Sequence, residues 1–203
     1  MDRKQHWEQV YAQKLPTEVS WFQPQPEYSL RLIAAAGIAR EQPIIDLGGG
    51  ASRVVDNLLE QEYRDISVLD ISGTALQHTR ARLGERATAV QWIEADATVF
   101  EPPKVYALWH DRAVFHFLTD PADRLAYRQR LARGLQTGGY LIIATFALDG
   151  PEKCSSLPVQ RYSPETLSAE LGSGYTLVET LSEAHVTPVQ KEQRFVYCRF
   201  VKI

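Results

Sequence analysis

From residue 43 onward, short apolar runs alternate with stretches in which apolar positions recur every three or four residues. Short apolar runs bounded by polar positions are typical of buried strands, whereas the longer spacing is typical of helices. The predicted strands cover residues 43–47, 66–70, 89–94, 106–111 and 140–147. Strands that alternate with helices form parallel βαβ units, so the pattern predicts a doubly wound α/β fold with helices on both faces of the sheet.

Between these strands, helices are predicted over residues 54–59, 74–83 and 120–135. The third begins with Asp120-Pro121, an acid at the N-cap followed by proline at the first helical position. Ser163-Pro164 repeats this start signal and predicts one further helix after the fifth strand.

The two ends of the chain depart from this alternation. Residues 174–184 and 193–201 read as strands joined by the short loop 183–192, which is too short for a parallel crossover and predicts an antiparallel hairpin. Residues 1–36 hold two helical stretches around a link rich in proline and aromatic residues. We expect one domain, residues 1–203, in which this N-terminal part is a helical cap or lid on a core of residues 43–203.

Composition narrows the class of protein. The chain has 203 residues, 44% of them hydrophobic and 23% charged, which is typical of a globular domain. A net charge of −3 without a basic run argues against a nucleic-acid partner. The longest apolar run, 140–148, is far short of the ~20 residues that span a bilayer. Two cysteines provide neither a disulfide framework nor a metal site, so we expect a cytoplasmic protein without a metal or a membrane partner.

The strongest local motif is the run from Ile44 to Ser52, in which a buried strand leads through Gly48, Gly49 and Gly50 into a helix. Glycines at such a turn let the backbone approach a ligand closely. The phosphate-binding pattern G-x-G-x-x-G would need a glycine where Arg53 stands. Asp46, two residues before the loop, is unfavourable beside a pyrophosphate and favourable beside an ammonium group.

Two further acids follow the next strands. Asp70 ends the second strand, 20 residues after Gly50, and its carboxylate is suited to accept from the paired hydroxyls of a ribose. Asp96 follows the third strand and is suited to accept from the exocyclic amine of adenine, with the Ala97 N–H available to a ring nitrogen. A single acid here is more often a solvated strand end or a helix cap, but three in order behind one glycine loop predict a nucleoside site.

Together with the terminal hairpin, Asp46-Leu47-Gly48-Gly49-Gly50, Asp70, Asp96 and Asp111 resemble the class I S-adenosylmethionine-dependent methyltransferases over residues 43–203. The resemblance implies a seven-stranded sheet of order 3-2-1-4-5-7-6 with strand 7 antiparallel. It implies that Asp46 and the glycines face the methionine end of S-adenosylmethionine, Asp70 the ribose and Asp96 the adenine. The implied cofactor contacts are Asp46, Leu47, Gly48, Gly49, Gly50, Asp70, Ile71, Asp96, Ala97 and Asp111. One departure is Ser52, where the family often has a further glycine.

The segment after the fourth strand holds the candidates for chemistry. In the resembled family it borders the methyl group, so Asp111 is a candidate to touch the methionine moiety or to orient an acceptor. His116 is the candidate general base, because an unperturbed pKa of ~6.5 suits proton transfer at neutral pH. A histidine between two phenylalanines is, however, more often a packed residue. His110 alternates to the side of the strand opposite Asp111 and is expected to be structural.

Acceptor-side candidates lie outside the cofactor motifs. Trp21 is expected either to cover the cofactor as part of a lid or to pack on the core. Phe22, Arg112, Arg161 and His185 are the candidate substrate-binding residues. The arrangement of Trp7-Glu8, Tyr11 and Trp21-Phe22 ahead of the glycine loop is similar to the N-terminal segment of some protein-lysine methyltransferases. It also occurs in families whose substrate is not settled, so it does not select the acceptor.

Three functions remain in order of preference. The first is methyl transfer from S-adenosylmethionine to a small molecule or a protein side chain, an in-line displacement that depends largely on alignment in a dry pocket. The second is a sensor module that binds S-adenosylmethionine without catalysis. The third, a nicotinamide-dependent oxidoreductase, is disfavoured by Arg53 and Asp46. The sequence alone leaves the methyl acceptor and the oligomeric state open.

Overall fold

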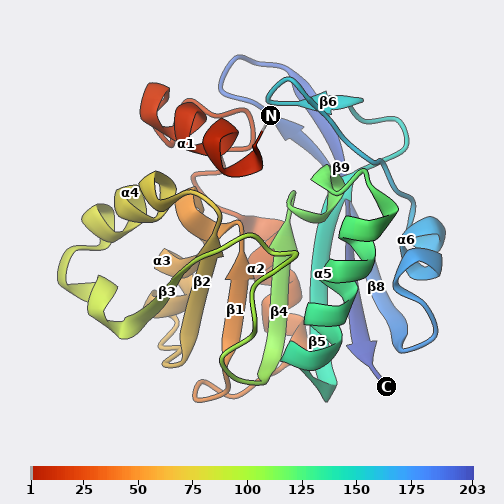
Figure 1. The fold of residues 1–203 in the computed structure, drawn as a ribbon. Helices are drawn as coiled ribbons and strands as arrows, with labels where there is room; N and C mark the ends of the chain where they lie inside the picture. The colour runs from red at the N-terminus through yellow and green to blue at the C-terminus, as the bar shows by residue number, and fades with distance from the viewer. Residues whose placement is uncertain (1) are drawn as a thin grey trace.

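The computed structural model describes residues 2–203, and over these residues a seven-stranded sheet runs through the centre of the molecule (Figure 1). Its strands are β1 (Ile44–Leu47), β2 (Ile66–Asp70), β3 (Val90–Glu94), β4 (Tyr106–Arg112), β5 (Leu135–Phe146), β8 (Tyr175–Val186) and β9 (Glu192–Lys202). The order is β3-β2-β1-β4-β5-β9-β8, with β1 to β5 parallel and β9 antiparallel to both of its neighbours. Counting β8 and β9 as the sixth and seventh strands confirms the predicted order 3-2-1-4-5-7-6.

Helices begin where the sequence carries start signals. They are α1 (Arg3–Gln13), α2 (Glu27–Ala36), α3 (Val54–Glu60), α4 (Gly73–Leu83), α5 (Pro121–Gly134) and α6 (Pro164–Leu171). The Asp120 side chain accepts from the Ala122 N–H at the start of α5, and Ser163 forms a capping box with Thr166 at the start of α6. Short 3₁₀ segments follow β1 (Gly49–Ala51), α4 (Gly84–Ala89) and β4 (Phe115–Phe117).

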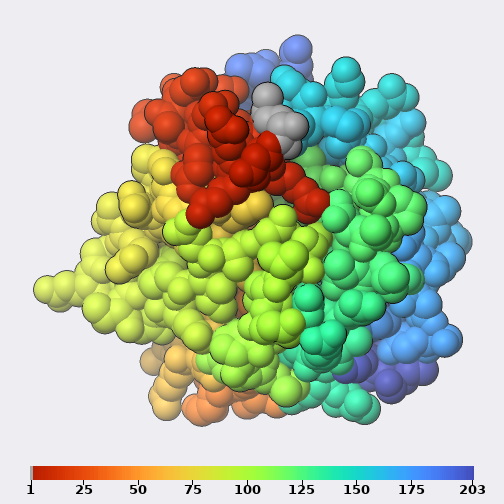
Figure 2. Space-filling view, viewed as in Figure 1, coloured from red at the N-terminus to blue at the C-terminus, as the bar shows by residue number. Residues whose placement is uncertain are grey.

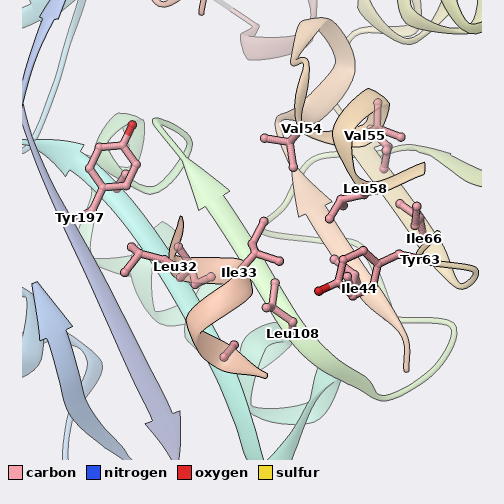
Figure 3. Packing of buried hydrophobic residues seen from close by; sticks show 14 of the residues in the cluster. Leu32, Ile33, Ile44, Val54, Val55, Leu58, Tyr63, Ile66, Leu108 and Tyr197 are labelled. Atoms are coloured by element: carbon pink, nitrogen blue, oxygen red, sulfur yellow. The ribbon is translucent and has the colours of Figure 1, made fainter. Parts of the chain in front are cut away.

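Helices cover both faces of the sheet, as predicted. On one face α2 and α3 pack Leu32, Ile33 and Leu58 against Ile44 and Leu108 of the strands (Figure 3). On the other face α5 contributes Tyr127 and Leu131, and α6 contributes Leu167, to a second group of buried residues. Because each central strand is buried on both faces, it reads as an almost continuous apolar run.

Alternation along two neighbouring strands determines which side chains meet near the upper edge of the sheet. In β1, Ile44 lies in the core on the α2 side and Ile45 in the core on the α5 side, so Asp46 returns to the α2 side. The parallel register pairs Asp46 with His110 of β4. These two polar residues therefore project on the same face.

Several boundaries differ from the predicted ones. The hairpin strands are longer than expected, so His185 lies within β8 and not in the connecting loop. β5 begins at Leu135, and its register against β4 is irregular between Tyr106 and Leu108. The link after β5 contains a small separate hairpin, β6 (Lys153–Cys154) and β7 (Leu157–Pro158).

The N-terminal part divides into two pieces with different positions. Helix α2 belongs to the layer that covers the sheet, and its Leu32 and Ile33 are fully buried. Helix α1 lies instead across the upper edge, against the N-terminal part of α4 (Figures 1 and 2). No helix among residues 2–203 is long and apolar enough to cross a membrane.

Candidate active site

The glycine loop after β1 brings bare backbone against two acids. Gly48 adopts a φ of 65°, a conformation that favours glycine, and starts the turn into the 3₁₀ segment. A Cβ at Gly49 would overlap Oδ2 of Asp46, and one at Gly50 would lie 2.6 Å from Oδ2 of Asp70. The loop therefore packs on both carboxylates more closely than any side chain allows.

A chain of two buried hydrogen bonds connects Asp46 to helix α2. Its Oδ1 accepts a hydrogen bond from His110 Nδ1 at 2.6 Å, and His110 Nε2 lies 2.9 Å from Ser29 Oγ. An ionised carboxylate only accepts, so His110 donates through Nδ1. The other oxygen, Oδ2, is buried and has no hydrogen-bond partner among residues 2–203. His110 is thus structural, as expected. It orients the Asp46 carboxylate so that Oδ1 is occupied and Oδ2 is left without a donor.

Asp70 joins the loop to the end of β2. Its Oδ2 accepts from the Gly50 N–H at 3.0 Å and its Oδ1 from the Ser72 N–H at 2.9 Å. Burial raises the pKa of this carboxyl group to about 6. Each carboxylate oxygen has a second acceptor position, so Asp70 is able to bind a ligand hydroxyl while it supports the loop.

Two cavities lie at the carboxyl ends of the parallel strands. The larger is lined by residues that include Asp70, Ile71, Asp96 and Ala97, so the structure brings these candidate residues together. The smaller is lined by residues that include Asp46, Leu47, His110 and Phe22. Gly48, Trp21 and Arg112 line both cavities, so the two spaces meet at the first glycine of the loop.

The larger cavity is roofed by the chain from Arg3 to Trp21, which we name the roof segment. The Trp7 ring meets the Trp21 ring edge-on at 5.7 Å and the Phe117 ring at 5.0 Å. Tyr11, from the same helix as Trp7, is 5% exposed and lines the cavity. Figure 2 shows the red N-terminal segment lying over the yellow α4 at this edge.

The roof segment is fixed to α4 by one carboxylate. Glu8 accepts hydrogen bonds from the Gly73 N–H at 2.7 Å, the Thr74 N–H at 3.3 Å and Ser72 Oγ at 3.1 Å. These donors belong to the first turn of α4, where a negative charge is favoured by the helix dipole. Glu8 therefore fastens the roof segment to the first turn of α4, beside the end of β2; we call these three hydrogen bonds the Glu8 clasp.

Asp96 connects the roof to the opposite side of the larger cavity. Its Oδ1 accepts from the N–H and the hydroxyl of Thr98 at 2.8 and 2.7 Å. Its Oδ2 accepts from Arg3 Nη1 at 3.2 Å, and the same guanidinium pairs with Asp123 at 2.5 Å. The predicted adenine-binding acid is thus also an anchor of the roof.

The structure does not bring Asp111 to the cavities that residues 2–203 form. Asp111 faces the α5 side of β4, where it accepts from Tyr127 Oη at 2.7 Å and from the Val114 N–H at 2.9 Å. Burial raises its pKa to about 6. It stabilises the turn after β4, so we propose no contact between Asp111 and a cofactor or acceptor.

His116, the candidate base, is likewise enclosed. It is fully buried, its ring packs on Phe117 and Phe146, and its Nδ1 accepts from the Phe146 N–H at 3.3 Å. Burial, with the nearby Arg112 charge, lowers its pKa to about 3. A neutral imidazole that is fully buried acts as a packing residue. This is the second of the two interpretations of His116, a general base or a packed side chain.

The acceptor-side candidates separate into two groups. Arg112 and Phe22 line a cavity, as predicted for a binding residue. Arg161 donates to the Gly150 carbonyl at 3.1 Å and pairs with Glu152, so it stabilises the link after β5. His185 Nε2 lies 2.8 Å from the Ser20 carbonyl oxygen and fastens the hairpin to the N-terminal link.

Sequence reasoning missed three contributors to the site. Glu8 and Arg3 act through contacts 65 and 93 residues away along the chain, which no local pattern reveals. Cys154 lines the larger cavity, and burial raises the pKa of its thiol to about 11, so it is protonated at neutral pH. The one signal for the position of His110 is the alternation of side chains along β4, in register with Asp46 of β1.

Comparisons with known proteins agree with this geometry. Residues 44–139 match the family model described as a methyltransferase domain. The chain is 24% identical over 147 residues to the mouse (Mus musculus) eEF1A lysine and N-terminal methyltransferase, covering 68% of this chain and 21% of that protein. The chain thus spans about a fifth of the length of this curated relative.

Solved structures share the whole fold. The chain resembles the N-methyltransferase NodS from Bradyrhizobium japonicum WM9, in complex with S-adenosylhomocysteine, with a TM-score of 0.71 and 16% identity over 96% of this chain and 97% of that one. It also resembles the structure reported as "Conversion of a Disulfide Bond into a Thioacetal Group during Echinomycin Biosynthesis", with a TM-score of 0.77 and 18% identity over 98% of this chain and 91% of that one. Such identities support the fold.

The fold is a doubly wound α/β sheet, and the cavities at the carboxyl ends of its parallel strands are lined by acids. The methyltransferase-domain match over residues 44–139 and the shared fold agree with the class I S-adenosylmethionine-dependent methyltransferases that the sequence resembles. Solved structures with this fold contain S-adenosylmethionine or S-adenosylhomocysteine, which supports S-adenosylmethionine as the cofactor. The buried free oxygen of Asp46 and the glycine cradle fit a ligand that carries an ammonium group.

Proposed function

We propose that this protein transfers the sulfonium methyl group of S-adenosylmethionine to a nucleophile on a small molecule or a protein side chain. The observation that carries the proposal is the meeting of the two cavities at Gly48. One cavity offers the acids suited to a nucleoside and the other offers the acid suited to an ammonium group. A ligand with a nucleoside at one end and an amino acid at the other matches both.

The larger cavity supports the adenosine half. Asp70 lines this cavity beside Ile71, and we assign it to the ribose hydroxyls. We assign Asp96 and the Ala97 N–H, whose residues line the same cavity, to the adenine edge. Hydrogen bonds to an ionised group contribute about 1.5–3 kcal/mol each, so Asp70 and Asp96 are the main polar anchors in this half.

The smaller cavity supports the methionine half, with the free oxygen of Asp46 as an acceptor for the ammonium group. The sulfur between the two halves then lies near Gly48 and Trp21, which border both spaces. When bound, S-adenosylmethionine supplies the electrophilic methyl group of its sulfonium.

The protein's own part in the reaction is enclosure and alignment. We propose the roof segment, Arg3 to Trp21, as a lid. Its Trp7 and Trp21 rings, together with Phe117 from the segment after β4, exclude water and present π faces to the cation. Such a contact contributes about 0.5–2 kcal/mol. The sealed His116 and the protonated Cys154 provide no base, so the proposed rate enhancement comes from holding the two reactants in line.

The test is turnover. The protein is incubated with methyl-labelled S-adenosylmethionine and, in separate reactions, with a small-molecule fraction and a protein fraction of a cell extract. Formation of S-adenosylhomocysteine with label in an acceptor supports the proposal, and Asp70→Ala serves as the cofactor-binding control. Binding of S-adenosylmethionine without turnover in either fraction would instead favour the sensor module.

A further inference from the structure

We propose that the methyl acceptor is a small aromatic thiol, which binds as its thiolate between the roof segment and the segment after β4. This inference rests on the function proposed above and names the class of acceptor for it. The observation that carries it is the chemistry of one side of the larger cavity, where aromatic rings meet a single positive charge.

The larger cavity has two sides that differ in chemistry. Among residues 2–203 the carboxylates that line it are Asp70, at the end of β2, and Asp96, after β3. In the order of the sheet, β4 and β5 lie beyond Gly48 and β1. The second side is formed by the end of β4, the segments after β4 and β5, and two tryptophans of the roof segment. We name this side the acceptor wall, and it includes Trp7, Trp21, Arg112, Ala113, Phe117 and Cys154.

The aromatic part of the acceptor wall suits a flat ring. Trp7 meets Trp21 edge-on at 5.7 Å between ring centres, and it meets Phe117 edge-on at 5.0 Å. All three side chains are half-buried, so each keeps surface for contact with a ligand. Aromatic rings prefer offset-stacked or edge-to-face contacts, and rings set nearly at right angles offer both kinds to a planar ligand.

The described residues of the acceptor wall offer neither a base nor a partner for an ammonium group. Burial raises the pKa of Cys154 to about 11, and it raises the pKa of the neighbouring Tyr11 well above its ordinary value, so both stay protonated. Asp70 and Asp96 lie on the other side of the cavity. A lysine side chain, with an ordinary pKa of about 10.4, would enter as a cation that no group there deprotonates. The acceptor therefore has to arrive in its reactive form.

Arg112 gives the acceptor wall a fixed positive charge. Its Nε donates to Tyr197 Oη at 2.7 Å, its Nη1 donates to the Trp21 carbonyl oxygen at 3.0 Å, and its side chain is only 10% exposed. Glu183, at 3.8 Å, pairs with it from outside the lining of both cavities. The charge of Arg112 favours the thiolate form of Cys154, although burial raises the pKa of that thiol by more. A ligand thiolate in the same place is stabilised in the same way.

An apolar enclosure with this charge favours an anionic acceptor. A thiolate and a sulfonium become two neutral molecules on methyl transfer, so the attraction between them is strong where water is excluded. A neutral amine would instead acquire a positive charge close to Arg112. A carboxylate is also an anion, but its charge is compact and strongly hydrated, whereas sulfur is polarizable and makes favourable contacts with aromatic rings.

The proposed step needs no group on the protein to take a proton. The thiol loses its proton to water before the ring enters the cavity. The thiolate sulfur forms a bond to the methyl carbon, and the bond from that carbon to the sulfonium sulfur breaks. The electron pair of the broken bond stays on the sulfur of S-adenosylhomocysteine. The products are an aromatic methyl thioether and S-adenosylhomocysteine.

The test uses acceptors that share one phenyl ring. Benzenethiol, phenol, aniline and benzoate are each incubated with the full chain and S-adenosylmethionine at pH 7.5, and a peptide that contains lysine is added as a further acceptor. The kcat/KM for benzenethiol should exceed that of every other acceptor at least tenfold. Trp7→Ala should raise the KM for benzenethiol. Arg161→Gln, outside the lining of both cavities, is the control and should leave it unchanged.

A second measurement follows binding without turnover. Benzenethiol is added to the protein saturated with S-adenosylhomocysteine, and the ultraviolet band of the thiolate is recorded from pH 8.5 to pH 6.5, above the pKa of about 6 at Asp70. Bound benzenethiol should remain ionised over this range, whereas Arg112→Gln should bind a growing share of neutral thiol as the pH falls. The other charged groups that line the cavity, Arg3, Asp70 and Asp96, are the same in both proteins.

The outcomes separate this inference from the proposed function. Faster methylation of phenol, aniline, benzoate or the peptide would overturn the inference and leave the proposed function standing. Benzenethiol bound as the neutral thiol at pH 7.5 would overturn it even if Arg112→Gln does not fold. A protein that binds S-adenosylhomocysteine but does not methylate benzenethiol would overturn it as well, and label transfer to the extract fractions then decides the proposed function separately.

Discussion

The Gly50 N–H donates a hydrogen bond of 3.0 Å to Oδ2 of Asp70, which ties the glycine loop after β1 to the end of β2. The same carboxylate accepts from the Ser72 N–H and lines the larger cavity. One side chain therefore organises the backbone of two loops and offers its remaining acceptor positions to a ligand. This double role determines what its removal should do.

Asp70→Ala should weaken both the fold and the cofactor complex. The loss of two hydrogen bonds to buried backbone donors is expected to lower the free energy of unfolding by about 1–3 kcal/mol. The Kd for S-adenosylhomocysteine should rise more than tenfold, because the ribose acceptor is lost as well. Urea denaturation and calorimetry measure the two effects. Asp149→Ala, an exposed acid, should change neither, and unchanged cofactor affinity in a folded Asp70→Ala protein would remove Asp70 from the site.

Gly49→Ala should weaken cofactor binding by more than the small size of the added methyl group suggests. The added Cβ overlaps Asp46 Oδ2, the atom proposed to receive the ammonium group, and lies 3.1 Å from Val68. The carboxylate or the loop must move, so we expect at least a tenfold weaker Kd and a stability loss of about 1–3 kcal/mol. Gly174→Ala is the matched control, because a Cβ there meets no atom of residues 2–203 within 4 Å. Equal affinities of the two variants would contradict the proposed close approach.

Cofactor affinity should fall as the solution is acidified. Burial raises the pKa of Asp70 to about 6, and a bound ribose favours the ionised carboxylate because the hydroxyls donate to it. Binding should therefore be strongest above pH 7 and weaken progressively below pH 6. A calorimetric series from pH 8 to pH 5 measures this, and a flat profile would argue against a ribose on Asp70.

The free energy of unfolding should depend on pH in the opposite direction, through the buried carboxyl groups of Asp70 and Asp111. Asp70 and Asp111 both have a pKa raised to about 6, above the value of about 3.9 in an unfolded chain. Between these values the folded state binds more protons, so their contribution to stability declines as the pH rises from 4 to 6. Urea titrations of Asp111→Asn and the unmodified protein across this range separate the Asp111 part. Parallel profiles would mean that Asp111 does not titrate there.

Glu8→Ala should loosen the roof and leave the core intact. Glu8 accepts three hydrogen bonds from the first turn of α4. In the variant that helix keeps its own N-cap, because the Ala75 N–H donates to Ser72 Oγ. We expect a stability loss of about 1 kcal/mol and faster release of S-adenosylhomocysteine. Stopped-flow tryptophan fluorescence measures the release rate, with Glu85→Ala, on the exposed surface, as the control. Identical release rates in the two variants would mean that the clasp does not close the lid.

The fold and the ordered acids could be predicted from the sequence because their signals are local. Strand periodicity, the glycine loop and an acid at each strand end are all visible within short windows, and parallel strands place their carboxyl ends at one edge. In the structure Asp46, Asp70 and Asp96 line the two cavities at this edge. The sequence after β1 also disfavours a dinucleotide loop, because Arg53 stands where the third glycine of the pattern would be.

The residues at the end of β4 and in the segment after it could not be assigned in the same way. Whether His110 or Asp111 faces the cavities depends on the register of β4 against β1, and a shift by one residue exchanges the two faces. The structure places His110 beside Asp46 and Asp111 beside Tyr127. The burial of His116 depends on contacts with Phe146 of β5, 30 residues away, which no window around His116 contains.

The most direct test of the central claim is a calorimetric titration of the protein with S-adenosylhomocysteine, with NAD titrated in parallel. If the two cavities form one site for a nucleoside joined to an amino acid, S-adenosylhomocysteine binds one to one and NAD does not. At a hundredfold excess over its Kd, the ligand should also raise the free energy of unfolding by about 2.7 kcal/mol. Binding of NAD, or no heat from S-adenosylhomocysteine at millimolar concentration, would contradict it.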